Sequence, residues 1–157
     1  MRVLRRGTVV TSADTFDLDR FVRAQASVYD QALSELRAGR KRSHWMWFVF
    51  PQLAGLGLSS MAQRYAIASI AEARAYLAHP VLGFRLVECA RALLSVPELS
   101  ALDIMGSPDD MKLRSCATLV AQVGDEGLIF NRVLDRFFCG AFDARTIALV
   151  RDVGDHA

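Results

Sequence analysis

A short basic and aromatic stretch, residues 40–51, carries the side chains best suited to ligand binding or proton transfer. It opens with three cationic residues, continues through Ser43 and His44, and contains both tryptophans of the chain. Lysine binds phosphate or carboxylate oxygens as a point charge and arginine through a planar fork, so Lys41 and Arg42 could hold an anion. Because a histidine side chain exchanges protons near neutral pH, His44 could act as an acid or a base.

The two tryptophans of this aromatic segment allow two interpretations. Trp45 and Trp47 could stack on a base or on a nicotinamide-like ring, with Ser43 beside them as a polar contact. Aromatic side chains also bury large areas in ordinary cores, so the same rings could simply anchor a polar loop. The sequence leaves both interpretations open.

A second segment, residues 109–115, combines two acids with two cations on a predicted helix. Asp110 and Arg114 are four residues apart and could form an ion pair on one face. Acidic residues in a first turn are explained by the helix dipole. The same argument does not account for Lys112 and Arg114 in an otherwise apolar helix.

If the two segments meet in space, they predict one binding site for a small anionic or nucleotide-like ligand. Its predicted members are Lys41, Arg42, Ser43, His44, Trp45, Trp47, Lys112, Arg114 and Ser115. His44 and Asp110 are the candidates for proton transfer, but no motif identifies a reaction, so whether the protein is an enzyme stays open. The three histidines and three cysteines lack the spacing of metal ligands, and no metal or cofactor is predicted.

Helical periodicity dominates the elements that must position these residues. Apolar residues recur in steps of three and four from Leu18 to Leu36, with a possible break near Ser27, an expected N-cap at Asp17 and an expected stop at Gly39. Similar patterns recur further along the chain, and no convincing strand appears. We therefore expect an all-α, compact single domain of about six to eight short helices that is not a simple four-helix bundle.

The two site segments occupy different kinds of structure in this prediction. Pro51, Gly55 and Gly57 interrupt the chain, so residues 40–58 are expected to form loops around one short helical turn. Ser107 followed by Pro108 predicts the start of the helix that carries the second segment.

Length and composition place the chain among globular proteins. Its 157 residues fit one domain, and 52% hydrophobic with 23% charged residues is a globular balance. We expect a lead-in at residues 1–14, a domain at 15–153 and a tail at 154–157. No apolar run approaches the roughly 20 residues of a membrane span. Cys89 and Cys116 are expected to be buried free thiols, which favours a cytoplasmic protein, with a monomer as the default.

The charge distribution bears on the alternatives. Three arginines and one aspartate within residues 1–14 carry the whole formal net charge of +2, so the rest of the chain is balanced. A nucleic-acid binder needs an excess of positive charge, which makes that function the weakest alternative. The stronger alternative is a protein-interaction module without catalysis, in which the aromatic segment belongs to the core.

Much of the sequence is similar to one protein family. The segments that carry the similarity are Phe16-Asp17-Leu18-Asp19-Arg20-Phe21-Val22, Ala24-Gln25, Gly39-Arg40-Lys41, Ser43-His44-Trp45-Met46-Trp47, Pro51-Gln52-Leu53, Gly55-Leu56-Gly57, His79-Pro80, Leu82-Gly83, Arg85-Leu86, Glu88-Cys89, Pro108-Asp109-Asp110, Lys112-Leu113-Arg114-Ser115 and Phe137-Phe138. They resemble the DUF1810 family across roughly residues 16 to 150. The resemblance implies a compact, mostly helical bacterial protein of the Rv1873-like fold group, and it implies no activity.

Overall fold

The computed structural model describes residues 14–156, which contain ten α-helices, one 3-10 helix and no β-strand. The helices are α2 (Asp19–Gln25), α3 (Tyr29–Arg37), α4 (Met46–Val49), α5 (Ser60–Arg64), α6 (Ile70–Ala78), α7 (Leu82–Ser95), α8 (Ala101–Met105), α9 (Asp109–Val120), η1 (Asp125–Leu128), α10 (Ile129–Phe138) and α11 (Ala144–His156). The predicted all-α class is confirmed.

The predicted number of six to eight helices is too low. The helices α4, α5 and α8 have only four or five residues each. A helix of one turn cannot display a recurring apolar face, so residues 40–58 are expected to hold only a short helical turn, and α4 lies there. The apolar stripe from Leu18 to Leu36 also divides into α2 and α3, at the expected break near Ser27.

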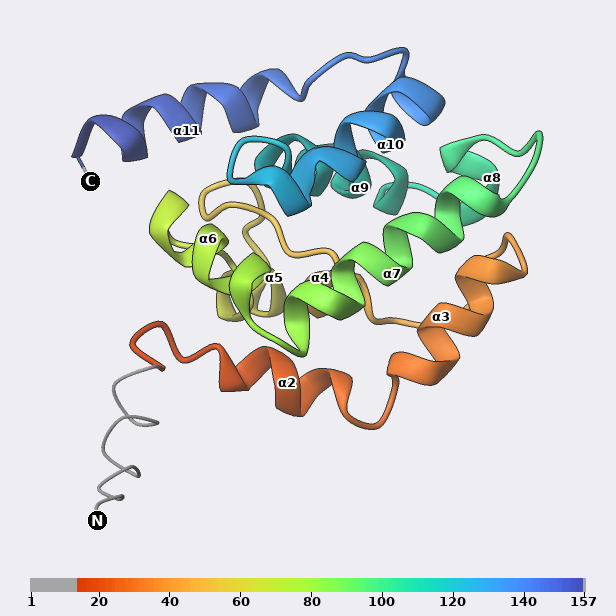
Figure 1. The fold of residues 1–157 in the computed structure, drawn as a ribbon, viewed down its shortest axis with the longest axis horizontal. Coiled ribbons are helices and arrows are strands. Elements are labelled where there is room, and N and C mark those ends of the chain that lie inside the picture. Colours follow the sequence, from red (N-terminus) through yellow and green to blue (C-terminus); the bar gives the residue numbers. More distant parts are fainter. Residues whose placement is uncertain (1–13, 157) are drawn as a thin grey trace.

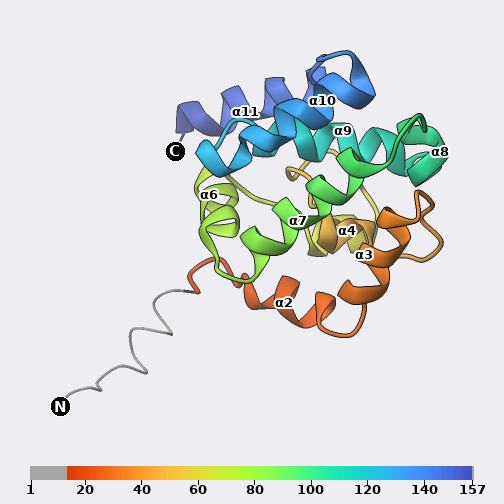
Figure 2. The ribbon, with the colours of Figure 1, turned by 45° about the vertical axis from the view of Figure 1, so that its right-hand side comes forward.

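Helix α7 runs through the middle of the molecule (Figure 1). It packs against α3, α6 and α10, while α9 packs against α8, α10 and α11. Figures 1 and 2 show α9, α10 and α11 on one side of α7, with α2 and α3 on the opposite side. The helices cross at varied angles, unlike the parallel arms of a four-helix bundle.

One core joins these helices to the loop between α3 and α5. It includes Phe21 of α2, Leu86 of α7, Phe130 of α10 and, from the loop, Trp45 and Phe50, all almost fully buried. Burial of such large apolar side chains is the main stabilising term for a chain of this size. The two thiols expected to be internal are buried, since Cys89 and Cys116 are both at 0% exposure.

Two predicted helix starts are wrong in detail. Asp17 has a positive φ of 53° and does not cap α2; instead Oδ1 of Asp14 accepts a hydrogen bond from the Leu18 amide. Ser107 does not cap α9 either, because that helix begins one residue later than expected, after Pro108. The predicted stop at Gly39 is confirmed, and its φ of 77° is one that glycine adopts without strain.

The structure describes the C-terminal end of the chain up to His156 but not residues 1–13. Residues 1–13 of the expected lead-in lie outside the described residues. Helix α11 continues to His156, so residues 154–156 of the expected tail are helical. None of the helices that the structure describes is long and apolar enough to cross a membrane.

Candidate functional site

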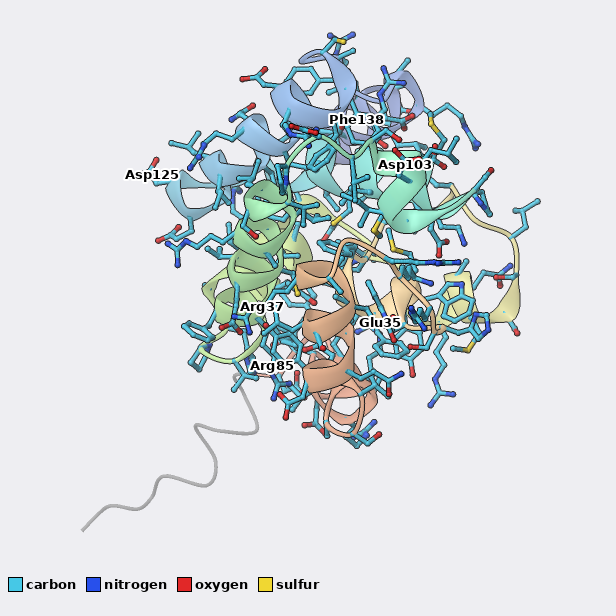
Figure 3. All side chains as sticks on the ribbon, turned by 90° about the vertical axis from the view of Figure 1, so that its right-hand side faces the viewer. Glu35, Arg37, Arg85, Asp103, Asp125 and Phe138 are labelled. Carbon is cyan, nitrogen blue, oxygen red and sulfur yellow. The ribbon has the colours of Figure 1, made fainter. Side chains whose placement is uncertain are left out.

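Glu35 of α3 fixes the loop that carries the aromatic segment. Its Oε1 accepts hydrogen bonds from the backbone amides of Arg42 (2.8 Å) and Ser43 (3.1 Å) and from Nε1 of Trp45 (2.9 Å). Its Oε2 accepts from the Ser43 hydroxyl (2.7 Å) and from Nε2 of Gln31 (3.0 Å). Figure 3 shows Glu35 on the side of α3 away from Arg37. One carboxylate therefore organises the polar half of the loop.

The hydrogen bonds also fix the charge of Glu35. Burial alone would raise the pKa of this carboxyl, but its donors, with the Arg42 amide foremost, lower the pKa to about 2. Glu35 is not among the predicted site residues. Its place on the buried stripe, next to Leu36 and three residues after Ala32, is the signal that could have identified it.

The two predicted segments meet at Asp109. Nζ of Lys41 lies 2.8 Å from Oδ2 of Asp109, and Nζ of Lys112 lies 3.6 Å from Oδ1. The Lys41 ammonium also donates to the backbone carbonyl of Ser43 at 2.6 Å, and its side chain is only 8% exposed. Lys41 therefore both holds the loop against α9 and contributes charge to the site.

A cavity of about 330 Å³ opens at this junction. It is lined by Lys41, Arg42, Ser43, His44, Met46, Trp47, Ser107, Pro108 and Asp109. Within the described part of the chain, the side chains of Arg42 and His44 are in exposed residues and make no intramolecular bond. Their donors and acceptors are available to a ligand, and we call this space the basic cavity.

A second cavity of about 120 Å³ shares Met46 and Trp47 with the first, and we call it the aromatic cavity. It is lined by Met46, Trp47, Phe50, Gln52, Leu53, Ala54, Gly55, Gly57, Ala62, Gln63, Tyr65, Ala66 and Lys112. Trp47 is half-buried and lines both cavities. The Lys112 ammonium lies 5.6 Å from the centroid of its ring, close enough for a cation–π contact.

Three predicted site residues, Trp45, Ser115 and Arg114, line neither cavity. Trp45 is 1% exposed and packs against Phe50, so its ring belongs to the core and cannot serve as a stacking surface. Ser115 is 6% exposed and donates its hydroxyl to the backbone carbonyl of Met111. Arg114 lies on a different face of α9 from Lys112.

Arg114 instead holds the chain between α10 and α11. Its Nε and Nη2 donate to the carbonyls of Ala141 (3.0 Å) and Phe142 (2.9 Å). The ion pair that the spacing of Asp110 and Arg114 allows does not form among the described residues, because the Arg114 guanidinium donates to these two backbone carbonyls instead. Oδ1 of Asp110 is buried without a hydrogen-bond partner among the described residues, and Asp110 lines neither cavity.

The part of the molecule that the structure describes holds no group of three metal-binding side chains. What converges is a set of cations, one exposed imidazole and a half-exposed indole around two adjoining cavities. Such a surface can hold negative charge next to a flat ring.

Fold and site together define a compact helical protein with one long aromatic loop fastened between α3 and α9. The chain belongs to the DUF1810 family, described as a protein of unknown function, whose model matches residues 15–150. It is also similar to the crystal structure of the conserved hypothetical protein Rv1873 from Mycobacterium tuberculosis. That similarity has 53% sequence identity and a TM-score of 0.86, and covers 88% of this chain and 99% of the other. No curated protein matches the chain.

Proposed function

We propose that this protein binds a small anionic, nucleotide-like ligand at the basic cavity. The observation that carries the proposal is the meeting of the aromatic segment with α9, which brings Lys41, Lys112 and Trp47 together around Asp109. Arg42 and His44 add groups at the exposed rim of the same cavity.

The charge balance of the site favours an anion. Lys41 and Lys112 share the single carboxylate of Asp109, and the Arg42 guanidinium at the rim forms no ion pair among the described residues. Because the Asp109–Lys41 pair is largely buried, its charges are weakly screened by solvent. An incoming phosphate or carboxylate can therefore bind Lys112 and Arg42 without breaking the buried pair.

His44 is the remaining candidate for proton transfer at the basic cavity. Its side chain is exposed and free of intramolecular bonds among the described residues, whereas Asp110 reaches neither cavity. The proposal concerns ligand binding. If the protein also acts on the ligand, His44 is the candidate for proton transfer, because Asp110 lines neither cavity.

The other two functions receive less support. Burial of Trp45 accords with the aromatic segment as core, as the interaction module requires, but Trp47 stays half-exposed beside a cavity. A nucleic-acid binder would need a broad basic surface, whereas the cations of this site line two small cavities and two of them pair with Asp109.

The proposal can be tested by thermal unfolding with a panel of nucleotides, NAD fragments, ADP-ribose and simple anions. A ligand at about 100 times its dissociation constant stabilises the native state by roughly 2.7 kcal/mol, a clear rise in Tm. We expect one ligand class to raise the Tm of the wild type, and Lys112→Ala and Arg42→Ala to lose most of that rise. Arg91→Ala is the matched control, since Arg91 is an exposed arginine of α7 outside both cavities.

Two results would count against the proposal. One is the absence of any rise in Tm across the panel for the wild type. The other is an equal rise in the wild type and in the Lys112→Ala and Arg42→Ala variants, which would place the ligand elsewhere.

A further inference from the structure

We infer that the aromatic cavity is a ring subsite for the same ligand, which would make the ligand class a flat heterocycle joined to a phosphate group, as in a nucleoside diphosphate. This inference rests on the proposed function of the basic cavity. It goes beyond that function because it assigns the aromatic cavity as a second subsite and a heterocyclic ring as the part of the ligand bound there.

The walls of the aromatic cavity suit a flat ring. Trp47, Phe50 and Tyr65 line it, and Tyr65 is held by ring contacts with Phe21 (5.8 Å between centroids) and Phe48 (5.3 Å). Aromatic walls favour stacked or edge-on contact with another ring. These aromatic walls make no comparably favourable contact with a free phosphate ion.

Polar groups at the same cavity are free to bind the edge of a ring. The side-chain amide of Gln52 and the indole N–H of Trp47 have no hydrogen-bond partner among the described residues. Gln63 uses its Nε2 on the carbonyl of Leu58 at 2.8 Å, which holds this side chain in place and leaves its amide oxygen as an acceptor. A few fixed polar groups in a mostly apolar cavity are typical of small-molecule sites.

The backbone around the aromatic cavity is held in place before any ligand binds. Ala54 N donates to the Ile67 carbonyl (2.8 Å), and Ile67 N donates to the Gln52 carbonyl (2.9 Å), so that two loop segments are joined. Arg20 donates to the carbonyls of Arg64 (2.9 Å) and Ala66 (2.9 Å) on the far side. Preformed walls lower the entropy cost of binding.

The relation of the two cavities sets the shape of the ligand. Met46 and Trp47 line both, and Lys112 lines the aromatic cavity while its ammonium approaches Asp109, a lining residue of the basic cavity. The combined volume of the two cavities falls within the roughly 300–1,000 Å³ that is usual for small-molecule sites. Neither a single base nor a single phosphate would fill both cavities. A ligand with its ring in the aromatic cavity and its anion in the basic cavity uses both.

The test is calorimetric titration of the full chain with ADP, GDP, UDP and CDP, with the four corresponding nucleosides, and with pyrophosphate. We expect at least one diphosphate to bind about tenfold or more tightly than pyrophosphate. Ala54→Leu, which extends a side chain into the aromatic cavity, should remove that advantage and leave pyrophosphate binding unchanged. Ala71→Leu, at an exposed position of α6 outside both cavities, is the matched control.

The outcomes separate this inference from the proposed function. If the diphosphates bind no more tightly than pyrophosphate, and Ala54→Leu and Gln52→Leu leave them unaffected, the ring subsite is overturned while the anion site stands. If nucleosides bind as tightly as diphosphates and Arg42→Ala has no effect, the ring subsite is supported and the anion site is overturned. If no probe binds the folded wild type, both are overturned.

Discussion

At the scale of single residues, the buried carboxylate of Glu35 accounts for the shape of the aromatic segment. A polar loop of this kind has backbone amides that must find acceptors when they leave water. Glu35 accepts from two of them and also from the Trp45 indole. The same residue thus explains why Trp45 is drawn into the core while Trp47, two residues later, stays at the cavities.

This arrangement predicts that stability depends on the ionisation of Glu35. Its pKa in the folded state, about 2, lies below the roughly 4.3 of a free glutamate. The stabilisation is therefore present above about pH 5 and is lost as the pH falls toward 2; its size is on the order of 3 kcal/mol. Urea unfolding of the wild type and Glu35→Gln between pH 3 and 7 measures it.

The difference in unfolding free energy between the two proteins should stay constant from pH 7 to about pH 5 and shrink as the pH falls below that. Glu126→Gln is the control, because Glu126 is exposed and makes no contact of this kind. A difference that stays constant with pH, or a Glu35→Gln protein as stable as the wild type at pH 7, would show that the carboxylate does not hold the loop.

Side-chain chemistry could be predicted from the sequence, but burial could not. Residue types alone singled out Lys41, His44 and Trp47, and these do line the basic cavity. Nothing local distinguishes Trp45 from Trp47, since both follow the same cations. The difference arises from Glu35, which lies ten residues before Trp45, on α3.

At the scale of elements, Arg20 joins α2 to the segment between α5 and α6. Its guanidinium forms a salt bridge with Glu72 (2.8 Å), whose side chain is only 3% exposed, and donates to the backbone carbonyls of Arg64, at the end of α5, and of Ala66. This segment forms part of the wall of the aromatic cavity. The joint is therefore a structural support of the candidate site.

Loss of this joint should be costly. Arg20→Ala leaves the Glu72 charge buried without its partner, and we expect a loss of roughly 3–5 kcal/mol in unfolding free energy. Arg23→Ala is a control on the same helix, because Arg23 pairs with Asp19 at the surface, where such a pair is worth about 1 kcal/mol at most. Equal losses in the two variants, measured by chemical unfolding, would contradict this role for Arg20.

The elements themselves were predictable to the extent that they are long. The apolar stripes of α7 and α9 repeat over several turns, so their existence follows from periodicity. Each of α4, α5 and α8 is too short to show a period, and local punctuation is what indicates such helices, as with the helical turn expected within residues 40–58 where α4 lies. The meeting of residues 40–47 with α9 depends on packing between helices distant in sequence, which no local pattern specifies.

At the scale of the whole molecule, α7 separates the α2–α3 side from the α9–α11 side (Figures 1 and 2). The aromatic loop leaves α3 on the first side and is fastened to α9 on the second through Lys41 and Asp109. The candidate site is thus built where the two sides are tied together. A ligand that spans both cavities would contact the loop and α9 at once.

The most direct test of ligand binding at Trp47 is the two tryptophan indole N–H signals of the ¹⁵N-labelled protein. Pyrophosphate and each of the four nucleoside diphosphates would be added in turn, with Lys112→Ala measured beside the wild type. We expect at least one ligand to shift the Trp47 signal strongly while the Trp45 signal stays nearly fixed, because its N–H is bound to Glu35. In Lys112→Ala we expect neither indole signal to shift. An unmoved Trp47 signal with every ligand, or equal shifts in the variant, would contradict a binding site beside Trp47.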